Sequence, residues 1–286
     1  MGLVSEIRPS PIAGTWYEGN PDRLAQKIDR YLNTANIPDL AGEVIAVIAP
    51  HAGHRYSGRT AGHAFRTIQG QRRDLVIVVS PMHNPTAAQL LTTAHQAYST
   101  PLGNIWVDQD ALTSLTGFLL ADNLSLIPIP NDREHSLEIE LPFLQRALTG
   151  EFRLLPLMVH SQSPWISQCV GKALAQTVRA TQAQGKTALL VGSTDLSHFY
   201  SLRMAERLDQ TMLNQIAAFD PAAMFQVEAE GKGFACGLGA VTAVLWAARD
   251  LGANAIEILH HSTSAEETGD ETSVVGYGAA VALKRT

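Results

Sequence analysis

The sequence predicts an α/β protein, built as a three-layer α/β/α sandwich around a largely parallel or mixed central sheet. Short, largely apolar runs at 44–49 (VIAVIA), 75–80 (LVIVVS) and 187–192 (TALLVG) are typical of strands buried on both faces. These runs alternate along the chain with longer segments of helical periodicity, as expected for helices layered on a sheet. No linker or shift of composition divides the 286 residues, so we expect a single domain over 1–286.

The composition narrows the class of protein. Hydrophobic residues make up 45% and charged residues 17% of the chain, which is typical of a globular protein with a sizeable core. The net charge is -6 and basic residues form no run, so we expect no nucleic-acid partner. Residues 1–11 lack an apolar core of signal-peptide length, and no apolar stretch reaches roughly 18 residues. We therefore expect a cytoplasmic protein that does not associate with a membrane.

Local signals predict the elements of the first half of the chain. After an irregular lead-in at 9–20, Asn20 and Pro21 have the residue types of an N-cap and a first helical position, and a helix of about four turns follows. The strand at 44–49 ends at Pro50, and after a polar turn we expect the next helix to begin beyond Gly58. The other expected elements of this half are strands at 75–80, within 88–98 and 102–107, and at 124–129, with a helix at 108–121.

In the second half, Ser136 is expected to cap a helix that carries leucines at helical spacing, and Pro142 should kink or restart it. Gly185 and Gly252 are in place to end two later helices. The remaining expected elements are strands at 152–159, 187–192, 256–261 and 274–283, and helices at 164–184, 202–218, from 221 onward and at 240–251.

Three side chains with metal-binding chemistry follow buried or glycine-rich segments. His51 comes just after one buried strand, His83 comes just after the next, and Cys236 lies in a glycine-rich turn ahead of a helix, whose dipole favours a thiolate. Ligands of open α/β sheets bind at the carboxyl ends of the strands. Two imidazoles and a thiolate suit a transition metal and leave coordination positions open. Taken singly, each histidine is also explained as a loop residue bonded to backbone, and the cysteine as a small buried side chain.

The segment STDLSH at 193–198 places Asp195 and His198 after another predicted strand. His198 has the chemistry of a general acid or base, with Asp195 orienting a neighbour. A capping aspartate and a surface histidine explain the same pattern. Glu134 and His135 are either site residues or the solvated start of a helix. Of the other candidates, His160 is left open, while His260, His261 and Cys169 are assigned structural roles.

Several well-known site motifs are absent from the sequence. It contains no H-E-x-x-H, no P-loop, no complete G-x-G-x-x-G and no G-x-S-x-G. These absences weigh against zincin, kinase-like, Rossmann and esterase chemistry.

Six motifs, in order along nearly the whole chain, resemble the Memo family. They are AGTWY at 13–17, PHAGHRYSG at 50–58, EHSLEIELPF at 134–143, STDLSH at 193–198, ACG at 235–237 and SVVGY at 273–277. That family is similar in fold to the class III extradiol ring-cleaving dioxygenases, the LigB-like non-haem iron enzymes. The resemblance implies a LigB-like α/β/α fold, a metal-binding cleft formed by His51, His83 and Cys236, and an acid–base role for His198.

Two departures limit what the resemblance implies. The dioxygenases complete their ligand triad with a carboxylate where the Memo pattern and this chain have Cys236, so dioxygenase activity does not follow from the fold. His54 stands where the family commonly has an aromatic residue, and it is expected to alter the pocket.

The leading hypothesis is a metal-dependent, dioxygenase-like oxidoreductase. His51, His83 and Cys236 would hold Fe(II), with copper and zinc as alternatives, next to O2 and a small substrate such as a phenol. His198 and Asp195 would form the catalytic pair. Trp16, Tyr17, His54 and Tyr56 are expected to line the substrate site.

Two other classes of function remain open. In a hydrolase, Cys236 would be a nucleophile activated by His198, or a zinc ion would activate water. In a binding module, the cleft would hold a peptide partner, as the Memo resemblance also implies.

Overall fold

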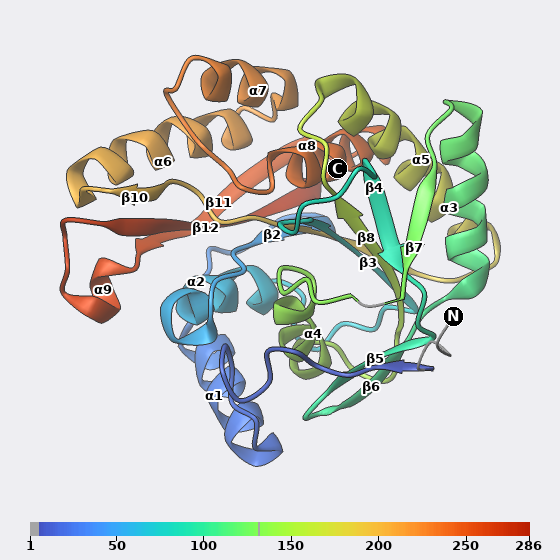
Figure 1. The fold of residues 1–286 in the computed structure, drawn as a ribbon, viewed down its shortest axis with the longest axis horizontal. Helices are drawn as coiled ribbons and strands as arrows, with labels where there is room; N and C mark the ends of the chain where they lie inside the picture. Colours follow the sequence, from blue (N-terminus) through green and yellow to red (C-terminus); the bar gives the residue numbers. More distant parts are fainter. Residues whose placement is uncertain (1–5, 131) are drawn as a thin grey trace.

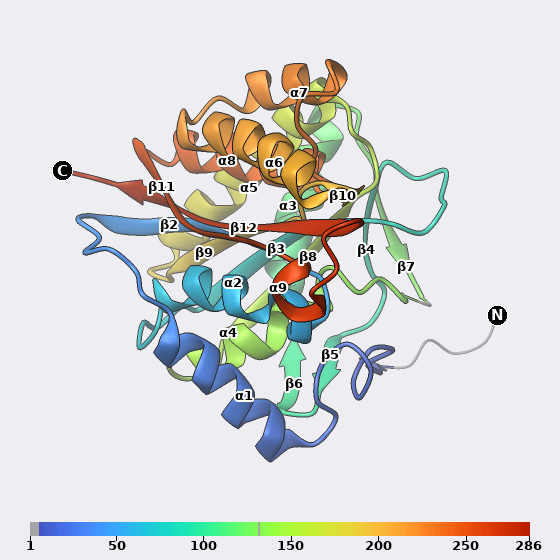
Figure 2. The ribbon, with the colours of Figure 1, turned by 90° about the vertical axis from the view of Figure 1, so that its left-hand side faces the viewer.

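The computed structural model describes residues 6–130 and 132–286, in which a nine-stranded sheet lies between two layers of helices (Figures 1 and 2). In spatial order the strands are β10 (His198–Tyr200), β12 (Val274–Lys284), β2 (Glu43–Ala49), β9 (Ala188–Ser193), β3 (Leu75–Pro81), β8 (Arg153–Val159), β4 (Leu90–Thr93) and β7 (Leu126–Ile129), with β11 (Ala255–Thr263) also paired to β12. Parallel pairs join β2 to β9, β9 to β3, β3 to β8 and β4 to β7, while β12 with β2 and β8 with β4 are antiparallel. The predicted α/β class with a mixed sheet is confirmed.

The helices cover both faces of this sheet, as Figure 2 shows. One layer contains α3 (Gln109–Ala121), α5 (Pro164–Ala183), α6 (Leu202–Ala217), α7 (Pro221–Ala229) and α8 (Leu238–Asp250). The other contains α1 (Pro21–Thr34), α2 (His54–Arg66), α4 (Leu141–Ala147) and the short α9 (Ala265–Thr268). Strand β3 shows why both faces are apolar: Val76 and Val78 pack into the core beneath α1, α2 and α4, whereas Ile77 and Val79 pack against α3, α5 and α8.

A second, three-stranded sheet contains the residues just before the lead-in segment. It consists of β1 (Ile7–Arg8), β5 (Ala97–Thr100) and β6 (Gly103–Trp106), with β1 parallel to β5. The pattern of the sequence did not indicate β1, because two residues are too few to show a period. The expected N-cap of α1 is confirmed, since the side chain of Asn20 accepts from the amide of Arg23 at 3.0 Å.

Two expected helix starts are corrected. Helix α2 begins at His54, not beyond Gly58, because Gly53 acts as its N-cap residue and the His54 amide donates to Trp16 O at 2.8 Å. The first turn is polar, so its apolar periodicity begins only later. Ser136 caps no helix: its hydroxyl donates to Pro81 O at 2.8 Å. A 3-10 turn, η1 (Glu138–Glu140), precedes α4, and Pro142 starts the new segment as predicted.

Among the described helices, none is both long and apolar enough to cross a lipid bilayer. The cytoplasmic location stays a prediction. Residues 1–5, on which part of the signal-peptide argument rests, and Asn131, ahead of the Glu134 motif, lie outside the described residues. The single domain over 1–286 likewise stays a prediction.

Candidate metal centre

Three neighbouring parallel strands end at one edge of the sheet and bring the candidate site together. Strand β9 lies between β2 and β3, and Ala49 of β2 is in register with Ser193 of β9. The carboxyl ends of these strands therefore meet, as ligand sites of open α/β sheets require. The residues that follow them, His51, His83 and Asp195, all line one cleft.

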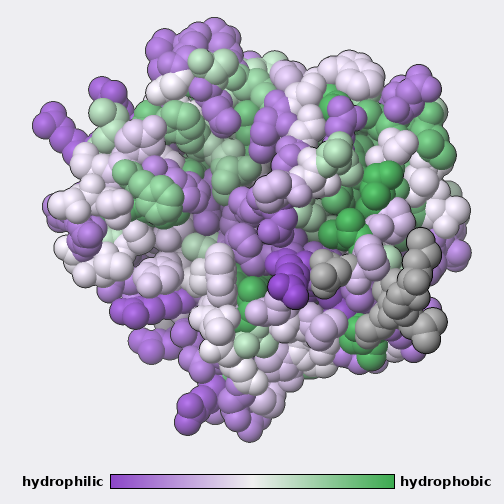
Figure 3. All heavy atoms as spheres, viewed as in Figure 1, coloured by the Kyte–Doolittle hydropathy of each residue, from purple (hydrophilic) through white to green (hydrophobic). Residues whose placement is uncertain are grey.

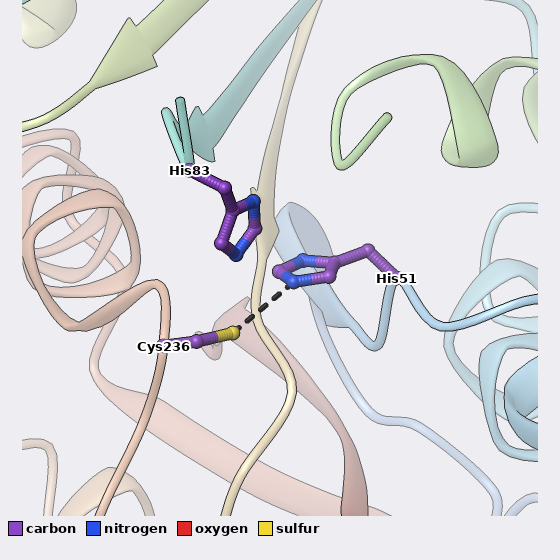
Figure 4. A group of neighbouring side chains, drawn as sticks. All are labelled: His51, His83 and Cys236. Carbon is purple, nitrogen blue, oxygen red and sulfur yellow. Dashed lines mark hydrogen bonds between the residues drawn. The ribbon is translucent and has the colours of Figure 1, made fainter. Parts of the chain in front are cut away.

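Cys236 completes a group of metal-binding side chains. The thiol comes from the turn before α8 and lies 3.1 Å from His51 Nε2. In His51, His83 and Cys236, one ligand atom from each lies within 4.8 Å of the others, and Figure 4 shows the three side chains pointing toward one another from separate segments. Bonds of about 2.1 Å to nitrogen and 2.3 Å to sulfur place such atoms roughly 3.5 Å apart around a tetrahedral ion. The residues fit a transition-metal ion after a small closing movement.

Hydrogen bonds to Ser193 fix the tautomer of His51. Ser193 Oγ contacts three groups: Ser136 O at 2.8 Å, Glu140 Oε1 at 2.7 Å and His51 Nδ1 at 2.9 Å. The hydroxyl has a single proton, which it donates to the carbonyl of Ser136, because a carbonyl can only accept. The hydroxyl oxygen must then accept from His51 Nδ1. Nδ1 of His51 is therefore the protonated nitrogen, and Nε2 keeps its lone pair on the side of Cys236. Burial lowers the pKa of His51 well below its ordinary value, so the ring is neutral, as a metal ligand must be.

Glu134 holds His83 in an equivalent way. Its carboxylate accepts from the His83 amide at 2.6 Å and from His83 Nδ1 at 3.0 Å, and also from the amides of His135 and Ser136 at 2.8 and 3.0 Å. Glu134 is fully buried, so the alternative of a solvated helix start is wrong. Despite its burial, the hydrogen bonds to His135 and His83 hold its pKa well below the usual range. The free ring nitrogen of His83 is thus Nε2, as in His51.

Asp195 and His198 do not contact each other through their side chains in the way that a catalytic pair would. Asp195 is buried, and its Oδ1 accepts from the amides of His51 and Ala52 at 2.8 and 3.3 Å. Burial raises its pKa to about 7. Its two hydrogen bonds hold the backbone of the turn that contains His51 and Ala52. His198 Nδ1 donates to Leu196 O at 2.8 Å, which leaves Nε2 free to accept a proton.

The cleft has a volume of about 560 Å³ and an aromatic wall. Trp16, Tyr56, Phe199 and Tyr277 line it together with His135, which sits 4.2 Å from Trp16 between ring centroids. Tyr17 and His54, expected in this lining, are instead buried below it. The Tyr17 hydroxyl donates to Glu138 Oε1 at 2.6 Å, and His54 Nε2 donates to Ile139 O at 3.0 Å. Figure 3 shows hydrophilic side chains gathered in the middle of the face drawn in Figure 1.

The expected acidity of Cys236 is also corrected. Burial, followed by the charge of Asp195, raises the pKa of the thiol well above its ordinary value, although the amide of Asp195 donates to the sulfur at 3.2 Å. A cation would have to displace the thiol proton on binding, as metals do at cysteine ligands.

The remaining histidines have other partners. His261 Nε2 bonds Asp209 at 2.8 Å, His260 stacks on His63 at 4.1 Å between centroids, and His160 Nδ1 donates to Met82 O at 3.0 Å. A separate cavity of about 740 Å³ lies at the amino ends of β3, β8 and β9. None of the described histidines or cysteines lines it.

Glu140 shows an effect of the site on stability that can be tested. The side chain is fully buried and one carboxyl oxygen has no partner among the described residues, so burial raises its pKa well above the usual value. The folded protein therefore holds the Glu140 proton more tightly than the unfolded chain does. As pH rises above about 4.5 the unfolded chain loses this proton first, and stability falls by up to roughly 1.4 kcal/mol per pH unit. Glu140→Gln should make the fall of stability between pH 5 and 8 shallower in urea unfolding; parallel curves for the two proteins would contradict the assignment.

Comparisons of the sequence with known proteins agree with the resemblance that its motifs indicate. A family model described as Memo-like protein matches residues 8–281. A MEMO1 family protein of Nitrosopumilus maritimus is 32% identical over 281 residues, covering 96% of this chain and 98% of the relative. A MEMO1 family protein of Methanothermobacter thermautotrophicus is also 32% identical over 281 residues, with 95% and 98% covered, and one of Methanosarcina mazei is 30% identical over 277 residues, with 96% and 99% covered.

Proposed function

The chain belongs to the Memo-like protein family, and we propose that it is a metal-dependent redox enzyme whose ion is held by His51, His83 and Cys236. One observation carries the proposal. Both histidines use Nδ1 for a hydrogen bond to a buried partner, Ser193 or Glu134, and keep Nε2 for the shared centre. Such outer contacts orient imidazole ligands of metal ions and increase their basicity.

The donor set favours a transition-metal ion. Two imidazoles and a thiolate suit iron, copper or zinc, and exclude magnesium and calcium, which prefer oxygen. We favour Fe(II), because three protein ligands beside a cleft leave positions for substrate and O2. When bound, the ion would supply electron transfer between these reactants.

The chain's own residues would bind the substrate and move its proton. Trp16, Tyr56 and Tyr277 offer aromatic surface to a small planar molecule such as a phenol. Burial lowers the pKa of His198, so its ring is neutral near pH 7 and Nε2 can accept a hydroxyl proton. The carboxyl group of Asp195, which accepts a hydrogen bond from the His51 amide, keeps His51 in place while this occurs.

Metal binding is the direct test. Metal-free protein is titrated anaerobically with Fe(II), Cu(I) and Zn(II), and we expect one ion per chain, with affinity at least about tenfold weaker in Cys236→Ala and His51→Ala. His160→Ala is the matched control, because His160 also follows a strand but lies outside the group. Stoichiometric iron or copper would justify an O2-uptake screen with catechols. No Cys236-dependent binding of any ion would contradict the proposal and favour a peptide-binding cleft.

A cysteine hydrolase is the second candidate, favoured by the 3.1 Å contact between Cys236 and His51. The sequence suggested His198 as the partner of the thiol, but the histidine in contact with it is His51. Chelation separates the two functions. A metal ligand becomes open to alkylation only after chelator treatment, whereas a nucleophile is trapped by a substrate-like electrophile regardless of chelator.

A further inference from the structure

The candidate metal centre lies between two cavities that share His198. His51, His83 and His198 line the cleft, but Cys236 does not; it lines a smaller cavity of about 250 Å³. We call this cavity the back pocket, and its lining includes His198, Tyr200, Glu228, Phe234, Ala235 and Cys236. In Figure 4 the cysteine approaches the centre from a different side than either histidine. His198 therefore lines both cavities.

The back pocket has room for a small molecule and a mainly apolar wall. A dry cavity of about 150 Å³ already holds benzene. Tyr200 and Phe234 stack with ring centroids 5.8 Å apart and form one side. This surface suits an uncharged molecule of a few heavy atoms.

Glu228 gives the back pocket its charge. One carboxyl oxygen accepts from the Ala235 amide at 3.2 Å, and within the described residues no lysine, arginine or histidine forms an ion pair with it. Lys232, the cation next along the chain, pairs with Glu230 instead. An uncompensated carboxylate in a half-buried wall repels anions.

We propose that the back pocket is a second entrance to the centre, through which small uncharged molecules reach the Cys236 sulfur while anions are excluded. The cleft is then left to the larger organic substrate. The role of this entrance in delivering a small co-reactant such as O2 rests on the proposed function; the access route itself does not.

Alkylation of metal-free protein tests the route. Iodoacetamide and iodoacetate are similar in size, but only iodoacetate is an anion. Their rates at Cys236 are measured by peptide mass spectrometry at pH 8.5, since burial raises the pKa of Glu228 as well as that of the thiol. Cys169 on α5, which is not among the residues that line the pocket, is the internal reference in every digest.

The expected result is a change of charge selectivity in one variant. Glu228→Gln should raise the iodoacetate rate at Cys236 by about fivefold and change the iodoacetamide rate less than about twofold, because one repelling charge is lost near the path. Glu230→Gln is the matched control: it removes an exposed carboxylate two residues away, outside the pocket, and should change neither rate. If the ratio of the iodoacetate rate to the iodoacetamide rate at Cys236 is the same in Glu228→Gln as in the wild type, the proposal is overturned.

A second pair of variants tests the path by size. Phe234→Trp narrows the back pocket and should slow both reagents, whereas Trp16→Ala widens the cleft and should leave both rates unchanged. The reverse result would place the route in the cleft. Protection of Cys236 by added Zn(II) is recorded in parallel: its failure would count against the metal site alone, because the charge and size results need no metal.

Discussion

Glu134→Ala is expected to weaken metal binding about 10- to 100-fold and to lower stability by roughly 3 to 5 kcal/mol. The fully buried carboxylate accepts hydrogen bonds from the amides of His83, His135 and Ser136 and from His83 Nδ1, and His135 Nδ1 also lies 3.0 Å from it. Without it, the buried amides of His135 and Ser136 lose their acceptor and the His83 ring is free to rotate. Affinity is measured by competition with a chelating dye and stability by urea unfolding.

The control must separate loss of stability from loss of the site. Asp209 is also a fully buried carboxylate that accepts from a backbone amide, of Ser197 at 2.9 Å, and from a histidine, His261 at 2.8 Å. Asp209→Ala should therefore destabilise the protein by a similar mechanism and leave metal affinity unchanged. Equal losses of affinity in both variants would show that Glu134 acts only through stability.

The part of the fold that the sequence predicts well is the part set by local pattern. The apolar runs that became β2, β3 and β9 are short and bounded by polar residues, and their carboxyl ends carry His51, His83 and Asp195. Ligands at such strand ends follow from the general behaviour of parallel sheets. The grouping of these side chains could therefore be expected, whereas the order of the strands could not.

The sequence could not predict contacts that depend on distant partners. Glu134 stands in a polar segment that suits a solvated loop, and its role as a buried acceptor depends in part on His83, which lies 51 residues away along the chain. The role of Glu140 likewise depends on its hydrogen bond with Ser193, which lies 53 residues further along the chain. Tyr17 and His54 were expected to line the substrate site but are buried, because a residue type does not tell whether a ring faces the cleft or the core.

Arg8 extends the network behind His83 into the amino-terminal strand. Its guanidinium is buried and lies over the ring of Tyr98 at 4.7 Å, with Nε 2.8 Å from Asp132 and Nη1 on Glu138. Nη2 donates to the carbonyl of Glu134 at 2.7 Å, and Asp132 accepts from the Glu134 amide at 2.9 Å. The backbone that carries the Glu134 carboxylate is thus clamped from both sides.

Arg8→Met should lower stability by about 3 to 5 kcal/mol, because it leaves the two buried carboxylates of Asp132 and Glu138 without their cation. Urea unfolding measures the loss, and adding Glu138→Gln to the same chain should recover part of it. Arg179→Met is the matched control: Arg179 pairs with Asp250 at the surface, where such pairs contribute about 0 to 1 kcal/mol. A small loss in Arg8→Met, equal to that of Arg179→Met, would mean that the carboxylates are neutral or hydrated, and that β1 does not hold the loop of Glu134.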